Sequence, residues 1–171
     1  AVDDLFDMEG LDVFRQMTRY GTARLVGEQN ITFFKGAGGT VTARGMKASF
    51  SFTSPKKATF TEDLVFTFNK EGKICNVTFG LGKTAEESIL CRNVSWGDDV
   101  KAQIMEFMEN YKTAYCLKRL EYIRDIFADD AVIIVGRVTH RNGSTTSIGE
   151  HQVSQFGQDI ITHNRYTKDE Y

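Results

Sequence analysis

The stretch VKAQIMEFMENYKTAYCLKRLEYIRDIFADDAVIIVGRV, residues 100–138, decides the fold expected of this chain. Apolar residues recur every three or four positions through its first half, which predicts a long amphipathic helix. Asp98 or Asp99 is expected to cap that helix. Its expected buried stripe consists of Val100, Ile104, Phe107, Tyr111, Ala114 and Leu117 or Lys118.

A second helix and a strand follow within the same stretch. Leu120, Ile123 and Phe127 have helical spacing, and the unbroken apolar run of residues 132–135 predicts a strand covered on both faces. Residues 139–149 have the Gly, Ser and Thr content of a loop, and residues 152–162 read as another strand. We expect this strand to pair with residues 132–135, because an apolar strand needs partners on its edges.

The pattern upstream of the quoted stretch is that of an antiparallel meander behind one short helix. Leu11, Phe14 and Met17 have helical spacing, with Gly21 expected as the C-terminal cap. From Asn30 the apolar period becomes two, and turn signals at 36–39 and 69–72 separate the strands. The expected apolar face carries Phe50, Phe52, Phe60, Leu64, Phe66, Phe68, Cys75, Val77, Phe79 and Leu81. The other face is rich in Thr, Ser and Lys, and residues 83–90 read as a short helix.

Composition sets limits on the classes of function. The chain has 171 residues and 41% hydrophobic content, enough for a substantial core, and its net charge of −2 gives no electrostatic footprint for nucleic acid. No apolar run approaches the roughly 18 residues of a membrane span. Of the three cysteines, Cys75 and Cys91 could form a disulfide, or all three could be small buried apolar residues.

Two segments carry a resemblance to a known family. FMENYKTAYCLKRLEYIRDIFADDAVIIVG (107–136) and EDLVFTFNKEGKICNVTFGLG (62–82) resemble uncharacterised secreted proteins of gut Bacteroidetes. In those proteins an α+β region precedes a nuclear-transport-factor-2-like, cystatin-like domain, a cone in which helices wrap a curved sheet. The resemblance implies export to the periplasm or cell envelope and brings no established activity. This sequence departs from a full domain of that type, because the later strands do not follow residues 132–135.

We therefore expect an α+β fold in which helices pack against a curved antiparallel sheet. The expected regions are 1–96, the meander, and 97–171, the opening of the cone domain. We expect them to pack as one compact unit, with the long helix on the Phe-rich face. Thr167 and Glu170 have capping-box spacing, which announces a helix. Either the natural protein continues beyond Tyr171, or packing elsewhere completes this turn.

Four residues are candidates for a ligand pocket. Tyr111, Tyr115 and Tyr122 could present hydroxyl groups to a ligand, or could be ordinary half-buried helix residues. Asp130, with Asp129, could be a carboxylate at the mouth of a cone pocket and act as a general base. The alternative for the Asp pair is a turn in which at least one carboxylate accepts a backbone N–H.

Other motifs give no site. His140, His151 and His163 match no zinc spacing, so no metal is expected. Gly36, Gly38 and Gly39 lie between strands, which favours a hairpin turn over a phosphate-binding loop. No cofactor is implied.

Three functions remain open on this basis. The first is a non-catalytic binding or interaction module of the bacterial cell envelope, whose partner is an unknown small molecule or protein. The second is a small cone-fold enzyme that acts on an apolar molecule by proton transfer. The third is a structural dimerisation module, hence a possible homodimer. An enzyme requires a pocket with a desolvated acid or histidine beside polar partners, whereas a dimerisation module requires a self-complementary apolar face.

Overall fold

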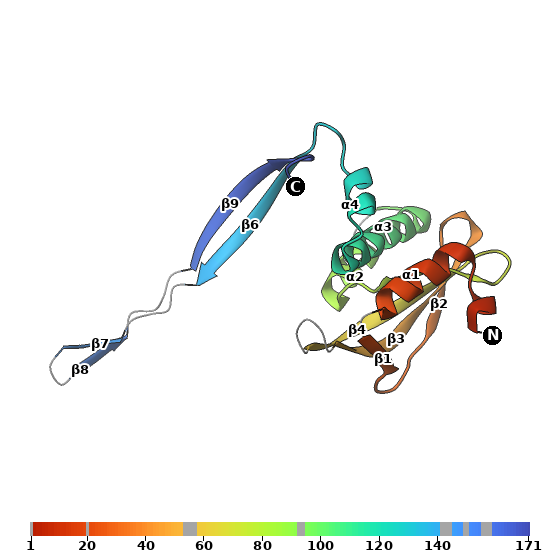
Figure 1. The fold of residues 1–171 in the computed structure, drawn as a ribbon, viewed down its shortest axis with the longest axis horizontal. Helices are drawn as coiled ribbons and strands as arrows, with labels where there is room; N and C mark the ends of the chain where they lie inside the picture. The colour runs from red at the N-terminus through yellow and green to blue at the C-terminus, as the bar shows by residue number, and fades with distance from the viewer. Residues whose placement is uncertain are drawn as a thin grey trace. The chain divides into compact units, whose positions relative to one another are not determined.

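The computed structural model describes residues 2–19, 21–52, 58–91, 95–140, 145–148, 151–154 and 159–171. The chain forms two compact units, Ala1–Leu120 and Glu121–Tyr171, which are described separately. The boundary follows Leu120, whereas the sequence interpretation placed it after Trp96, and packing of the regions as one compact unit stays a prediction. Figure 1 shows the course of the chain through both units.

The first unit is an antiparallel sheet with helices before and after it, so the expected α+β class is confirmed. Strands β1, β3, β4 and β5 follow one another in the sheet, and β2 pairs with the first part of β3. The elements are η1 (Val2–Leu5), α1 (Met8–Thr18), β1 (Gly21–Leu25), β2 (Thr32–Lys35), η2 (Ala37–Gly39), β3 (Val41–Phe52), β4 (Ala58–Phe68), β5 (Ile74–Phe79), α2 (Lys83–Leu90) and α3 (Asp98–Leu117).

The sequence interpretation missed β1. Gly21 begins this strand, opposite Phe52, and the C-terminal cap of α1 is Arg19. At the other end of α1, the Asp7 carboxylate accepts the Gly10 N–H at 2.9 Å, as an N-cap residue does. The turn expected at residues 36–39 is present and contains η2.

A bulge in β3 determines which of its side chains reach each face. The register with β4 shifts between Ala43 and Met46, and Gly45 lies between them with a φ of +88°. A Cβ at Gly45 would lie 2.1 Å from the Asn30 carbonyl oxygen, so both the backbone conformation and the space require glycine. The extra residue lets Ala43 and Met46 share the apolar face while Arg44 projects from the opposite face.

The Phe-rich face of the sheet is the core of the first unit, as predicted. Phe50, Val77 and Phe79 are buried there, and Phe52, Phe66 and Phe68 pack against them partly buried. Helix α1 and the segment before it cover this face with Phe6, Leu11, Phe14 and Met17. The prediction that Cys75 joins this face is wrong, because a second register shift after Thr67 places Ile74 in the core instead.

The stripe predicted for the long helix is confirmed only in part. Val100 and Phe107 are 45% and 49% exposed, whereas Ala114 of that stripe is buried and Leu117 packs against the core. The other buried residues of α3 are Met105, Glu109 and Thr113. The Thr113 hydroxyl accepts the Phe79 N–H at 2.8 Å, and Glu109 reaches Arg44. Helix α3 therefore lies mainly on the polar face of the sheet, whereas α1 covers the Phe-rich face. Gly97 is the N-cap residue, so neither Asp98 nor Asp99 caps the helix.

In the second unit, α4 (Leu120–Ile126) leads to two long paired strands, β6 (Val132–His140) and β9 (Asp159–Thr167). Strands β6 and β9 pair, but the predicted partner of residues 132–135 is wrong, because these residues face 164–167. Of the expected partner segment 152–162, residues 159–162 lie in β9 and pair with 137–140. A short pair, β7 (Thr145–Ile148) and β8 (His151–Ser154), lies between them; part of the expected loop falls outside the described residues. Val132 and Ile134 are more than half exposed, so the prediction of cover on both faces is wrong.

The second unit ends on the expected capping interaction. The Glu170 carboxylate accepts the Thr167 N–H at 2.8 Å and the Thr167 hydroxyl at 2.9 Å. These bonds lower the pKa of Glu170. A turn rather than a helix follows Thr167, so the capping signal is satisfied locally.

Candidate functional site

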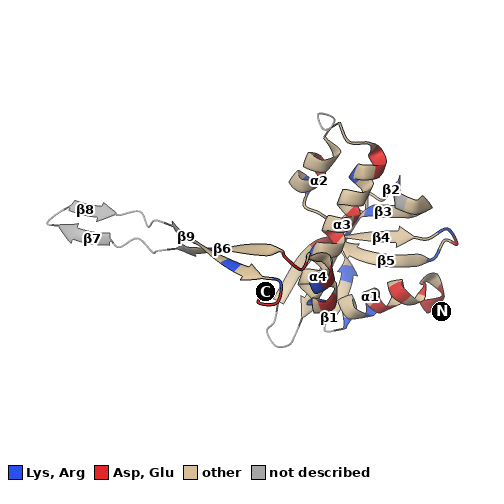
Figure 2. Cartoon of the chain, turned by 90° about the horizontal axis from the view of Figure 1, so that it is seen from above, with Lys and Arg blue, Asp and Glu red and all other residues tan. Residues whose placement is uncertain are grey.

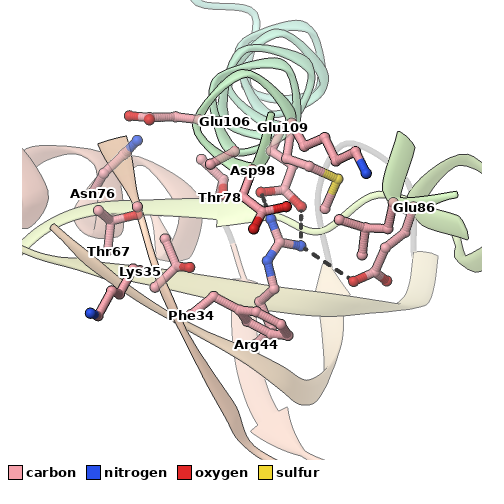
Figure 3. A pocket seen from close by; sticks show the side chains of 16 residues that line it. Phe34, Lys35, Arg44, Thr67, Asn76, Thr78, Glu86, Asp98, Glu106 and Glu109 are labelled. Carbon is pink, nitrogen blue, oxygen red and sulfur yellow. Dashed lines mark hydrogen bonds and ion pairs between the residues drawn. The ribbon is translucent and has the colours of Figure 1, made fainter. Parts of the chain in front are cut away.

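A cavity of about 310 Å³ lies between the polar face of the sheet and helices α2 and α3 (Figure 3). Strands β2 to β5 each contribute side chains to its floor, because every second residue of a strand points to this face. The residues that line it are Phe34, Lys35, Gly36, Thr42, Arg44, Thr67, Asn76, Thr78, Glu86, Leu90, Asp98, Lys101, Ala102, Met105, Glu106 and Glu109. The helices thus contribute the apolar residues Leu90, Ala102 and Met105 together with charged side chains, and the sheet contributes a mainly polar floor.

A two-point ion pair between Arg44 of β3 and Glu109 of α3 occupies one end of the cavity. The two guanidinium nitrogens Nη1 and Nη2 donate to Oε1 and Oε2 of Glu109 at 2.7 and 2.6 Å. The side chains are 13% and 2% exposed, so this pair is among the most buried charges of the unit. Arginine is suited to this role, because its planar fork matches a carboxylate.

The electrostatics of Glu109 reflect two opposed effects. Burial raises the pKa of this carboxyl, whereas the hydrogen bonds and charge of Arg44 and the Leu81 N–H, 3.2 Å from Oε1, oppose the rise. Both carboxylate oxygens therefore have donors, and none of the buried polar side-chain atoms in the described part of the chain lacks a partner. The pair joins α3 to the sheet at a point where an unpaired charge would be costly.

Arg44 also divides the cavity from a smaller hollow of about 200 Å³. Phe34, Arg44 and Glu86 line both spaces, and the Glu86 carboxylate of α2 lies 3.9 Å from Arg44. Helix α2 has no buried residue, and this longer ion pair joins it to the sheet. Figure 2 shows that acidic residues occur along α2 and α3.

Neutral contacts and one more ion pair support the same arrangement. Thr67 and Thr78 are buried on the cavity floor, and the Asn76 amide donates to Asn110 of α3 at 2.7 Å. Lys112 of α3 donates to Glu62 at 2.6 Å and to the Gly80 carbonyl oxygen at 2.8 Å. Residues 109–113 of α3 are therefore fixed to the sheet, which gives this end of the cavity a defined shape.

The structure places the four predicted pocket residues elsewhere. Tyr111 and Tyr115 lie on the outer side of α3, with ring centroids 6.1 Å apart, and Tyr115 is 55% exposed. Tyr122 of α4 is half-buried and Asp130 is exposed, both in the second unit. None of the four lines either described cavity, although their part in binding stays a prediction.

Asp129 has a structural partner, but a different one from that predicted. Its carboxylate accepts Lys168 Nζ at 2.8 Å, and this hydrogen bond and charge lower the pKa of Asp129. The expected donor was a backbone N–H. The contact joins the turn before β6 to the turn after β9, so this carboxylate serves the local structure of the second unit.

Other candidate groups do not gather into a site within the described residues. No group of three or more His, Cys, Asp or Glu there could hold a metal ion. Cys75, Cys91 and Cys116 are free thiols, so the possible disulfide between the first two is not formed. No helix in the described ranges has the length and apolar character needed to cross a membrane.

Sequence reasoning missed Arg44 and Glu109, although a signal for each was present. Arg44 is a lone charge between Ala43 and the Gly45 bulge, and Glu109 lies on the side of α3 opposite the apolar stripe. A scan against protein-family models and searches of curated proteins and of solved structures found no match to this chain. The geometry of the cavity therefore carries the functional argument.

Proposed function

We propose that the chain is a non-catalytic binding module whose ligand is a small molecule held between α2, α3 and the sheet. The observation that carries this proposal is the cavity of about 310 Å³. Ligand pockets are generally about 300–1,000 Å³, mostly apolar, and contain a few well-placed polar groups. Phe34, Leu90 and Met105 supply apolar surface here, while Thr67 and Thr78 supply hydroxyl groups.

The surroundings of Glu109 support binding over proton transfer. A general base needs a lone pair that can reach the substrate proton. Glu109 has the burial of such a base, but its oxygens accept both Arg44 nitrogens and the Leu81 N–H. Breaking these bonds would leave an unpaired charge in a buried position, which is strongly unfavourable. We therefore assign Glu109 and Arg44 to the framework of the cavity.

The finer parts of the proposal rest on the resemblance of residues 62–82 and 107–136. They are membership of the nuclear-transport-factor-2-like fold and export to the periplasm or cell envelope. Fractionation of the native host tests the location: a cytoplasmic chain would contradict the export part alone and leave the cavity proposal standing.

Ligand binding can be tested with a fragment library and heteronuclear NMR of the whole chain. We expect amide shifts to cluster at Thr67, Thr78 and Met105. Ala102→Trp should abolish them, because Ala102 lines the cavity and the indole would fill it. The matched control is Gln103→Trp, one position along α3 at an exposed site, which should leave binding intact. Fragments that bind Ala102→Trp as well as the natural chain would contradict the proposal.

A further inference from the structure

The outer side of α3 carries a stripe of apolar side chains that are exposed or half-buried. Val100, Phe107, Met108 and Tyr115 are 45%, 49%, 40% and 55% exposed, and Ile104 and Tyr111 between them are half-buried. All six lie on the side of the helix opposite Met105, Glu109 and Thr113, which face the sheet. Helix α3 therefore has one side that faces the sheet and another that presents large apolar side chains.

The stripe is unusual for a solvated surface. Single exposed apolar residues are common, but a continuous row of large ones marks an interaction site. Residues 100 to 115 span about 22 Å of helix at 1.5 Å per residue, and no charged residue interrupts the six. Four of the six residues, Val100, Ile104, Phe107 and Tyr111, belong to the stripe whose burial the helical periodicity predicted.

The arrangement of residues along the stripe selects the partner. The positions are symmetric about the midpoint between Phe107 and Met108, so a second α3 running antiparallel would place Val100 opposite Tyr115 and Ile104 opposite Tyr111. Each aliphatic side chain then packs against an aromatic ring, whereas in a parallel pair each residue would face the same residue of the partner. Such a two-fold contact is self-complementary, with each residue meeting its counterpart twice.

Charge supports the same direction. An antiparallel pair places the negative C-terminal end of each helix dipole beside the positive N-terminal end of the partner's, whereas a parallel pair brings like ends together. Asp98 lines the ligand cavity on the sheet side of α3, so it has no part in this contact. We propose that the chain forms a homodimer through the stripe of α3, with the two helices antiparallel. The ligand cavity lies on the other side of α3, so this interface is independent of the proposed ligand binding.

Sedimentation equilibrium of the whole chain over a range of concentrations tests the dimer. The natural chain should reach the mass of two chains, and Met108→Glu should shift it to one, because the carboxylate would lie at the two-fold axis. The matched control is Met8→Glu, since Met8 is a 90% exposed methionine of α1 outside the stripe. A monomeric natural chain, or a dimer that tolerates Met108→Glu, would overturn the proposal. A monomer that loses thermal stability with Met108→Glu but not with Met8→Glu would show that the stripe is covered within one chain.

Cross-linking tests the direction of the helices. In a Cys116→Ser background, Val100→Cys and Tyr115→Cys chains should form a disulfide dimer when mixed and none when each is oxidised alone. Cross-linking of each variant with itself would indicate a parallel pair and contradict the proposal. Circular dichroism of both variants shows whether they keep the fold, so a failure to cross-link can be read as a result about the interface.

Discussion

The two faces of the first unit's sheet are built from the same strands and differ in nearly everything else. On one face, α1 covers a continuous apolar core in which Phe50, Val77 and Phe79 are almost fully buried. On the other, α2 and α3 cover threonines and the Arg44–Glu109 pair and leave a cavity of about 310 Å³. Apolar side chains fill space by adjusting to one another, whereas a fixed ion pair and its donors hold two elements at a set distance. The polar face is therefore the one that can retain a site.

The largest effect on stability is expected from a substitution in the apolar face of the sheet. Phe50→Ala should lower the free energy of unfolding by about 3–5 kcal/mol, because a ring 2% exposed leaves a cavity in a packed core. Urea denaturation measures this. Phe66, for which the sequence alone predicts a similar loss, is only partly buried, so its truncation should cost less.

The control for this prediction is Phe33→Ala on β2. Phe33 is 66% exposed, so its truncation should change the free energy of unfolding by less than about 0.5 kcal/mol. Equal losses at Phe50 and Phe33 would mean that the apolar face is not the core.

The next effect tests the ion pair of the polar face. Arg44→Met should cost about 2–4 kcal/mol, because it leaves the Glu109 charge buried without its main donor. This loss of stability should be smaller than the loss expected on breaking a fully buried ion pair, since Arg44 keeps some exposure. Denaturation of Arg44→Met, Glu109→Leu and the double variant forms a thermodynamic cycle. The double variant should recover much of the stability that either single variant loses, and strictly additive losses would show that the pair acts as two independent groups.

A smaller effect concerns the contact between α3 and the edge of the sheet. Thr113→Val should cost about 1–3 kcal/mol, because the buried Phe79 N–H loses its acceptor while the side-chain volume is kept. Thr61→Val, at an exposed position of β4, is the matched control and should be near neutral. Hydrogen exchange of the Phe79 amide should accelerate in Thr113→Val alone. Unchanged protection there would mean that this hydrogen bond does not hold α3 on the sheet.

The smallest effect is a pH dependence. The raised pKa of Glu109 means that the folded chain binds this proton more tightly than the unfolded chain does. Its contribution to stability is therefore fully present below the ordinary pKa of 4.5 and is lost as the pH rises through the raised value. The melting temperature of the natural chain should fall relative to that of Glu109→Gln across this window. A relative rise would show that Arg44 outweighs desolvation.

Short-range patterns were enough to predict much of the architecture. The alternation of Phe50, Phe66 and Val77 identified the apolar face of the sheet, and residues 83–90 were recognised as a helix at the bounds that the structure has. A strand after Asp130 also followed from sequence, but its partner did not, because residues 132–135 pair with 164–167 and not with the predicted 152–162. These features depend on residues near one another in the chain or on a periodicity of two or 3.6, which sequence displays directly.

Tertiary contacts decided the site and the orientation of α3. Arg44 and Glu109 are 65 residues apart, and nothing local indicates that a bulge at Gly45 turns one toward the other. The helix pattern correctly marked Val100 and Phe107 as one apolar face, but periodicity does not say which of two faces meets the sheet. Here the face with Glu109 and Thr113 does, because it satisfies the Arg44 guanidinium and the Phe79 N–H. Burying those groups unpaired would cost more than exposing part of an apolar stripe, and only the assembled structure brings them together.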